Sequence, residues 1–137
     1  MIAIPIKIKK ETCFLSTLFG KAKYFALINN NSVEIVKNEQ NSGKAVADWL
    51  KSKNVNILIT SHMREKPFES LLNHNIKTYF ARDKKIDINK ILLQYADGEL
   101  PILDHNLFQI IFKKHFFKKN INSNKIAAEF HFYSIYF

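Results

Sequence analysis

The sequence predicts an α/β domain built on a mixed sheet, and three observations support this prediction. Residues 2–8 alternate and are rich in β-branched side chains, which is typical of a strand. Residues 24–28 and 33–36 have the same character on either side of the asparagine-rich turn 29–32, which predicts a hairpin. Between residues 43 and 98, helical and strand patterns alternate, as in βαβ units. We therefore expect the order β-β-β-α-β-α-β-α and a five-stranded mixed sheet with helices against its faces.

The first strand and the segment after it have two unusual features. Pro5 lies within the strand and predicts either a bulge or a position without a ladder hydrogen bond. Residues 9–22 are predicted to form a long connection, which contains Cys13. Long connections are uncommon in compact domains and often carry function. This segment is therefore a candidate part of a site.

Three helices are predicted where apolar residues recur at helical spacing. Asn41 or Ser42 is expected to cap the first helix, and Pro67 suits the first turn of the second. Strands are expected at 55–60 and 76–80, and the apolar end of the former is typical of a buried parallel strand. The buried stripes are Val46, Trp49 and Leu50, then Phe68, Leu71 and Leu72, and finally Ile88, Ile91, Leu92 and Tyr95.

Residues 101–137 differ from the rest in composition. They hold nine of the 18 aromatic residues and no glycine. Residues 107–119 predict a poorly amphipathic helix, in which Phe108, Phe112 and Phe116 share a face, and residues 127–137 predict a strand. Because exposed aromatic residues favour aggregation, we expect this aromatic-rich extension to cover either the domain or a partner protein. A second copy of the chain is one such partner.

Length and composition limit the class of protein. With 137 residues and 47% apolar residues, the chain is expected to form one domain with a substantial core. It contains no apolar run of membrane-spanning length and no pattern of a signal peptide, so we expect no membrane partner. The single cysteine, Cys13, excludes an internal disulfide and fits a cytoplasmic protein.

The net charge of +9 raises the question of nucleic-acid binding. Nineteen of the 21 basic residues are lysine, and only Arg64 and Arg82 are arginine. Arginine is the better reader of phosphates and base edges because its planar guanidinium bonds bidentately. A solvated basic surface is therefore the favoured interpretation, and weak nucleic-acid binding is the less favoured alternative.

Short motifs follow one another over residues 1–100. They are Ile2-Ala3-Ile4-Pro5, Ser16-x-x-Phe19-Gly20-x-Ala22-x-Tyr24-Phe25, Asn38, Ser61-His62-Met63 and Ala96-x-Gly98-Glu99-Leu100. Together with the order of elements, they resemble the dinitrogenase iron–molybdenum cofactor biosynthesis family, the domain type of NifX and of the C-terminus of NifB. The resemblance covers residues 1–100, and residues 101–137 match nothing expected in that family.

The resemblance implies a ribonuclease-H-like, three-layer α/β/α fold. In that fold the first strand lies parallel to the strand at 55–60 and antiparallel to the strand at 24–28. It also implies that the chain binds or ferries an iron–sulfur or iron–molybdenum-type cluster, or its precursor, alongside other metallocluster assembly proteins. Three positions depart from the family pattern. Leu18 stands where the family has a cofactor-binding histidine, and Ser61 and Arg64 stand where it has glycines.

The candidate site lies where the loops after parallel strands open at one edge of the sheet. There, Cys13 and residues 18–20 are expected to face residues 61–67, where a helix begins and offers free N–H groups to an anion. Cys13 and His62 are the candidate metal ligands, because thiolate and imidazole both bind iron. The other candidate cofactor-binding residues are Phe19, Gly20, Ser61 and Met63.

Each candidate also has a structural explanation. Cys13 could be a small apolar filler, and His62 could be a surface histidine. Phe19 is expected in the core, and Gly20 is expected to permit a turn that a Cβ would block. His74 is expected to cap the end of the second helix rather than to bind metal.

The favoured function is that of a non-catalytic carrier of a metallocluster. The alternative is a protein-interaction or oligomerisation module that kept the fold and lost the ligand, an interpretation favoured by Leu18 and by the extension 101–137. No acid, base and nucleophile set is visible. The predicted central strands also lack the carboxylates with which ribonuclease-H-like nucleases hold metal ions. We therefore expect that the chain is not an enzyme.

Overall fold

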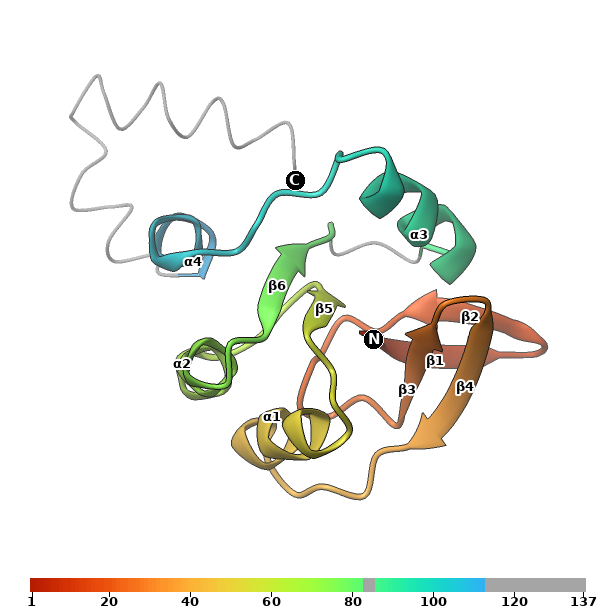
Figure 1. Ribbon diagram of the computed structural model, residues 1–137, viewed down its shortest axis with the longest axis horizontal. Helices are drawn as coiled ribbons and strands as arrows, with labels where there is room; N and C mark the ends of the chain where they lie inside the picture. The colour runs from red at the N-terminus through yellow and green to blue at the C-terminus, as the bar shows by residue number, and fades with distance from the viewer. Residues whose placement is uncertain (83–85, 113–137) are drawn as a thin grey trace.

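The computed structural model describes residues 1–82 and 86–112, and over these it forms a mixed α/β domain with a six-stranded open sheet and four helices (Figure 1). The strands are β1 (Ile2–Lys9), β2 (Thr12–Leu15), β3 (Tyr24–Asn29), β4 (Ser32–Lys37), β5 (Ile57–Thr60) and β6 (Lys77–Phe80). The helices are α1 (Gly43–Ser52), α2 (Glu65–Asn73), α3 (Ile88–Ala96) and α4 (His105–Phe112).

The central strand is β1, and the order across the sheet is β4-β3-β1-β5-β6. β1 is antiparallel to β3 and parallel to β5, and β5 is parallel to β6. The neighbours expected for the first strand are therefore confirmed. The assignment to the ribonuclease-H-like class stays a prediction.

Pro5 causes no bulge, because the register between β1 and β3 is continuous through Pro5 and Phe25. Its carbonyl oxygen accepts a hydrogen bond from the backbone N–H of Ser16 at 2.8 Å. Pro5 lies where the pairing of β1 passes from β5, next to Ala3, to β2, next to Ile6. The missing N–H therefore falls between two ladders, as expected for proline in a sheet.

The predicted loop 9–22 and the five-strand count are wrong. The chain turns at Lys10, which has a φ of 57°, and returns as β2, which pairs antiparallel with residues 6–9 of β1. The charged residues at 9–11 suggested a loop, but Lys9 ends β1 and only Lys10 and Glu11 form the tight turn of a hairpin. Thr12, Cys13 and Phe14 favour a strand, so the sixth strand has a local cause.

Helices cover both faces of the sheet (Figure 1). We call the face covered by α1, α2 and α4 the α1/α2 face, and its core includes Phe25, Leu58, Phe68, Leu71 and Phe108. The opposite face, the α3 face, has a smaller core that includes Ile4, Ile6, Ala26, Ile59 and Ile91. Neighbouring residues of β1 alternate between the two cores, since side chains of a strand point to opposite faces.

The segment from residue 101 to residue 112 packs on the domain. The N–H of Phe80 donates to the Pro101 carbonyl at 2.9 Å, and the N–H of Leu103 donates to the Thr78 carbonyl at 2.8 Å. Leu103, Leu107 and Phe108 are buried in the core of the α1/α2 face. These residues of the extension therefore pack on the domain, and whether the extension as a whole covers the domain or a partner stays a prediction. The remainder of the predicted helix 107–119 and the predicted strand 127–137 lie outside the described residues, and oligomerisation stays a prediction.

The helix ends agree with the sequence in part. Ser42 caps α1, because its Oγ accepts from the N–H of Ala45 at 3.1 Å. α2 begins at Glu65, so Pro67 lies in its first turn, as predicted. Proline is tolerated there because first-turn N–H groups have no partner within the helix.

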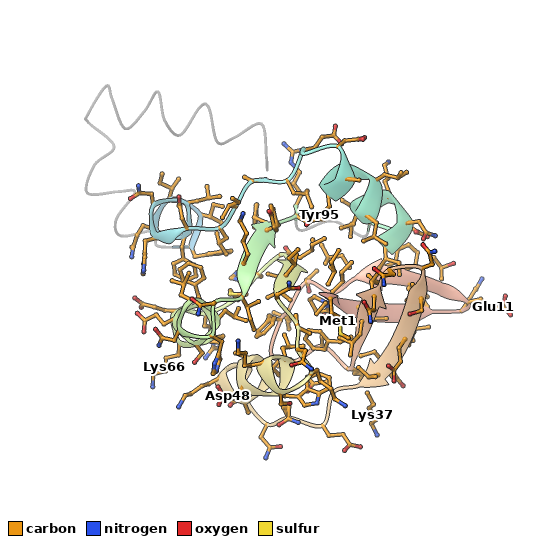
Figure 2. All side chains as sticks on the ribbon, in the orientation of Figure 1. Met1, Glu11, Lys37, Asp48, Lys66 and Tyr95 are labelled. Carbon is orange, nitrogen blue, oxygen red and sulfur yellow. The ribbon has the colours of Figure 1, made fainter. Side chains whose placement is uncertain are left out.

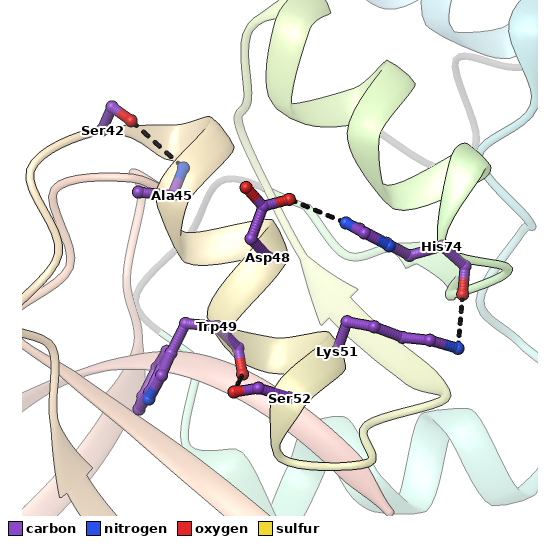
Figure 3. A network of polar contacts seen from close by, with 7 residues as sticks. All are labelled: Ser42, Ala45, Asp48, Trp49, Lys51, Ser52 and His74. Carbon is purple, nitrogen blue, oxygen red and sulfur yellow. Dashed lines mark hydrogen bonds and ion pairs between the residues drawn. The ribbon is translucent and has the colours of Figure 1, made fainter.

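His74 is the C-cap residue of α2, and its side chain reaches α1 (Figure 3). The His74 Nε2 donates to the Asp48 Oδ1 at 2.7 Å, and the Lys51 Nζ donates to the His74 carbonyl at 3.1 Å. The predicted position of His74 is confirmed, although its imidazole pairs with a carboxylate instead of capping its own helix. These contacts hold α1 and α2 side by side.

Charged side chains lie at the outer rim of the molecule, with Glu11 at the β1–β2 turn, Lys37 at the end of β4 and Lys66 on α2 (Figure 2). On the α3 face, the ring of Tyr95 stands edge-on to Tyr79 with centroids 5.0 Å apart. Burial raises the pKa of Tyr95, and Tyr79 raises it further. Each described helix is too short or too polar to span a membrane.

Candidate functional site

A cavity of about 500 Å³ opens where three loops meet beyond the carboxyl end of β5. The loops are residues 18–21 after β2, residues 41–43 at the start of α1 and residues 62–67, which run from the end of β5 into the first turn of α2. The lining residues are Leu18, Phe19, Gly20, Lys21, Asn41, Ser42, Gly43, His62, Met63, Arg64 and Pro67. The sequence expectation that residues 18–20 face the loop after the parallel strand agrees with this geometry.

Backbone contacts join the first and third loops. Leu18 and His62 form a parallel bridge, and the N–H of Phe19 donates to the His62 carbonyl at 3.2 Å. Asn38 fixes the first loop from behind, because its Nδ2 donates to the Ala22 carbonyl at 2.8 Å and to the Gly20 carbonyl at 3.3 Å. The motif residues Phe19, Gly20 and Asn38 thus share one structural task, which is to hold the cavity wall.

Two glycines allow the three loops to approach. A Cβ on Gly20 would lie 3.0 Å from the Cα of Gly43, and a Cβ on Gly43 would lie 2.3 Å from the Cγ of Pro67. Gly20 lies in a turn, as predicted, and the backbone of Gly43 would block a Cβ there. The first residue of α1 is held between the first loop and the first turn of α2.

The N-termini of α1 and α2 both contribute to the lining, through Ser42, Gly43, Arg64 and Pro67. Helix N-termini carry partial positive charge and N–H groups without an intrahelical partner. Ser42 satisfies one N–H of α1, whereas Arg64, the N-cap residue of α2, has no acceptor in its side chain. The cavity therefore lies at the positive ends of two helices, although Pro67 itself has no N–H to donate.

Side-chain charge adds to this field. Lys21 and Arg64 are exposed lining residues, and the described lining contains no carboxylate. Glu65, in the first turn of α2, lies beside the lining and balances part of the charge. The arrangement is suited to bind an anion of small or moderate size.

His62, Ser61 and Met63 differ in exposure. His62 is exposed and lines the cavity, with its ring stacked on Phe112 at 5.0 Å between centroids. Met63 is 4% exposed and belongs to the core of the α1/α2 face. Ser61 is 1% exposed, does not line the cavity, and its Oγ has no hydrogen-bond partner among the described residues. His62 is therefore the one imidazole among the described lining residues.

Cys13 lies elsewhere, so the expectation that it faces the loop 61–67 is wrong. It pairs with Ile8 in the β1–β2 ladder and packs, half-buried, against the core of the α3 face. The unforeseen strand β2 is the cause, since it fixes which face each of its side chains points to. Within residues 1–82 and 86–112, no three histidine, cysteine or acidic side chains gather into a group that could hold a metal ion.

A second cavity of about 420 Å³ lies between the end of β6 and the C-terminal end of α3. Its lining residues are Phe80, Arg82, Ile86, Gln94, Glu99, Leu100 and Pro101. It contains none of the predicted site residues and combines both signs of charge. The first cavity is therefore the better candidate site.

The sequence did not single out Lys21, the 41–43 segment or Phe112 as site residues. A signal existed for the segment, because a cap at Ser42 was predicted and a helix N-terminus attracts anions. No local signal existed for Phe112, because its contact with His62 joins residues far apart in the chain.

Solved structures share the fold. A protein of Thermotoga assigned as NifB is 29% identical, with a TM-score of 0.62, and the match covers 74% of this chain and 91% of that one. The apo form of the orange protein of Desulfovibrio gigas is 20% identical, with a TM-score of 0.64 and coverage of 74% and 91%. A protein of Methanocaldococcus jannaschii assigned as a dinitrogenase is 22% identical, with a TM-score of 0.59 and coverage of 75% and 93%. The last two matches show the fold alone.

No protein with a curated description matches the chain. The family model described as dinitrogenase iron-molybdenum cofactor matches residues 1–98. This range includes the cavity loops and ends before α4. The match spans well over half of the 137 residues, so the chain belongs to the dinitrogenase iron–molybdenum cofactor family.

Proposed function

We propose that this chain is a non-catalytic carrier that holds an anionic iron–sulfur or iron–molybdenum-type cluster in the cavity between the loops 18–21, 41–43 and 62–67. The observation that supports this best is the convergence of two helix N-termini, Lys21 and Arg64 on one cavity. Membership of the family supplies the kind of cargo. Its volume of about 500 Å³ falls within the range of about 300–1,000 Å³ usual for ligand pockets.

The donor set indicates how such a cargo would be held. Resident iron–sulfur clusters are usually bound by four cysteine or histidine side chains. Among the described lining residues His62 has the one imidazole and the Met63 thioether is a weak soft donor, while Cys13 is on the other face. Leu18 cannot bind metal. A cargo that brings its own sulfide and is held by charge and backbone N–H groups fits these residues, and such a cargo can be released.

A carrier exchanges its cargo with other proteins, so cluster assembly proteins are the proposed partners. Leu18 lies at the cavity and is 47% exposed. An exposed apolar residue beside a cationic cavity would suit contact with a donor or acceptor protein at the moment of transfer.

Anaerobic reconstitution with ferrous iron and sulfide, with and without molybdate, tests the proposal. We expect the wild-type protein to gain visible absorbance and to retain the metal through gel filtration. Arg64→Gln and Lys21→Gln should each weaken retention, because each removes a charge from the lining. Lys66→Gln is the matched control, since Lys66 is exposed on the same helix turn but does not line the cavity. If the wild type retains no metal, the carrier function is wrong.

An interaction module without a ligand is the second candidate, and Leu18 favours it, because an apolar residue stands where the family has a histidine. Deletion of residues 101–137 would remove Leu103, Leu107 and Phe108 from the core. It would therefore destabilise the domain and could not isolate the loss of an interaction surface. Leu18→Lys is the better variant. If the chain is an interaction module, sedimentation velocity should show a dimer or complex for the wild type that dissociates in Leu18→Lys. If it is a carrier, the sedimenting mass of Leu18→Lys should equal that of the wild type.

A further inference from the structure

The helix α4 lies beyond the family match and is firmly attached to the cavity side of the molecule. Phe108 of α4 is 2% exposed and stacks on Phe68 of α2, with ring centroids 4.6 Å apart and an interplanar angle of 6°. At the start of α4, His105 stands edge-on to the same Phe68 ring at 5.7 Å. The helix is therefore fixed on α2, the helix whose first turn lines the cavity.

One turn after Phe108, α4 brings Phe112 to the cavity residue His62. Residues four apart lie on the same face of a helix, so anchoring Phe108 sets the direction of Phe112. The Phe112 ring lies 5.0 Å from Phe108, 6.0 Å from Phe80 and 5.0 Å from His62, measured between centroids. Contacts on three sides give Phe112 a defined position.

His62 is held at two places, one on its backbone and one on its ring. Its carbonyl accepts from the N–H of Phe19, which fixes the backbone at the first loop. Its side chain is exposed, so the sheet does not fix the ring. The ring lies at 28° to Phe112, which is a stacked arrangement favourable for aromatic pairs. Among the residues that the structure describes, Phe112 is the ring stacked on His62, and this contact restricts the rotation of the imidazole.

We propose that Phe112 is a positioning residue that holds the His62 imidazole at the cavity, so that α4 sets how well the site retains its cargo. The ligand part of this proposal rests on the proposed carrier function. A ring in one orientation loses less freedom when it contacts a ligand than a ring that samples several. The family domain, residues 1–98, supplies the histidine, and a segment outside it supplies the orientation.

Three variants separate positioning from general stability. Phe112→Leu keeps an apolar side chain but removes the stacking partner, and Phe112→Tyr keeps the ring. Ile111→Ala loosens α4 elsewhere, because Ile111 packs on the same core. Two quantities are measured on the full chain. The first is the order of the His62 ring, from carbon-13 relaxation of labelled histidine, and the second is the retention of the reconstituted iron–sulfur species. The His62 signal is assigned from its absence in His62→Ala.

We expect ring order to fall in Phe112→Leu and to be retained in Phe112→Tyr and Ile111→Ala. Retention of the cluster should weaken about 2- to 10-fold in Phe112→Leu, the size expected for one aromatic pair, and should be restored in Phe112→Tyr. In the His62→Ala background, Phe112→Leu should have no further effect on retention, since the two residues act as one unit.

The outcomes distinguish this proposal from the proposed function. Unchanged ring order in Phe112→Leu overturns the positioning role. Lower ring order with unchanged retention overturns the link between α4 and the cargo. If the wild-type protein retains no cluster, the carrier function fails and the ligand part of this proposal fails with it, while ring order alone still decides whether Phe112 positions His62.

Discussion

The two faces of the sheet are built differently. The α1/α2 face is covered by three helices, and large side chains such as Phe25, Phe68 and Phe108 fill its core. The α3 face is covered in the described residues by one helix of nine residues, and Ile8 and Val33 stay exposed at 40% and 52%. The cavity lies at the end of the thicker layer, where the first turns of two helices meet.

This difference explains why the two candidate ligands cannot act together. His62 follows β5 and stays at the loop where the α1/α2 face ends, whereas Cys13 belongs to β2 and points to the α3 face. A face closed by several helices brings N-termini and loops to one point. A face closed by a single helix offers apolar side chains at its rim instead. We therefore expect ligand binding at the end of the α1/α2 face and not on the α3 face, and the following variants test this expectation.

The largest expected effect comes from the core of the thicker face. Phe68→Ala should lower the free energy of unfolding by about 3–5 kcal/mol, because it opens a cavity under α2 and removes the ring on which Phe108 stacks. Urea unfolding measures the loss. Ile91→Ala, on the α3 face, is the matched control and should lower it by about 2–5 kcal/mol.

Hydrogen exchange distinguishes the two variants where their stabilities overlap. Amides of α4 should lose protection in Phe68→Ala and keep it in Ile91→Ala, once both are corrected for global stability. Equal loss in both would mean that α4 is not attached through Phe68.

The second effect concerns the glycine contact beneath the cavity. Gly43→Ala should destabilise the protein by about 1–3 kcal/mol, because the new methyl group meets the Pro67 ring and the first turns of α1 and α2 must separate. The same separation should weaken retention of the cluster. Thermal or urea unfolding and reconstitution give the two readouts.

Gly98→Ala provides the contrast on the other side of the molecule. Gly98 has a φ of +73°, and a Cβ added there would meet no described atom within 4 Å, so alanine suffers backbone strain of about 1 kcal/mol and no collision. Retention of the cluster should be unchanged. A Gly43→Ala protein as stable as the wild type would show that the loops can move apart freely.

Most elements could be predicted from local patterns. Alternation in β1, the asparagine turn before β4 and the stripe of α1 each depend on residues close in the chain, and the resemblance supplied the parallel neighbour of β1. The strand β2 was missed because Lys9, Lys10 and Glu11 suggested a loop, although a two-residue turn needs few residues and Lys10 accepts a positive φ.

The site could be predicted only in part, for a physical reason. His62 and Gly20 were found because they lie in motifs, and both line the cavity. The ring partner of His62 depends on where α4 docks, and docking is decided by Leu103 and Phe108 in the core, not by any pattern around residue 112. The misplacement of Cys13 followed from the missed strand, since a strand fixes the face of every second side chain.

The third effect compares the two candidate ligands directly. His62→Ala should weaken retention of the reconstituted cluster about tenfold, which is the scale of one lost contact to a charged ligand. Cys13→Ala should leave retention within a factor of about two, because its side chain packs on the α3 face. Metal content per protein after gel filtration measures both. If Cys13→Ala alone abolished retention, the cavity would not be the binding site.

The smallest expected effect comes from the polar contact between α1 and α2. The side chains of His74 and Asp48 are 31% and 54% exposed, so water competes for their 2.7 Å contact. Asp48→Asn should therefore lower the free energy of unfolding by no more than about 0.5 kcal/mol. The Lys51 Nζ still donates to the His74 carbonyl, which keeps the helix ends together. Asp97→Asn, at the exposed end of α3, removes the same charge and is the control for the net charge of +9. A loss above about 1 kcal/mol for Asp48→Asn, with none for Asp97→Asn, would mean that this pair, and not the apolar core beneath it, holds the C-terminal end of α2 against α1.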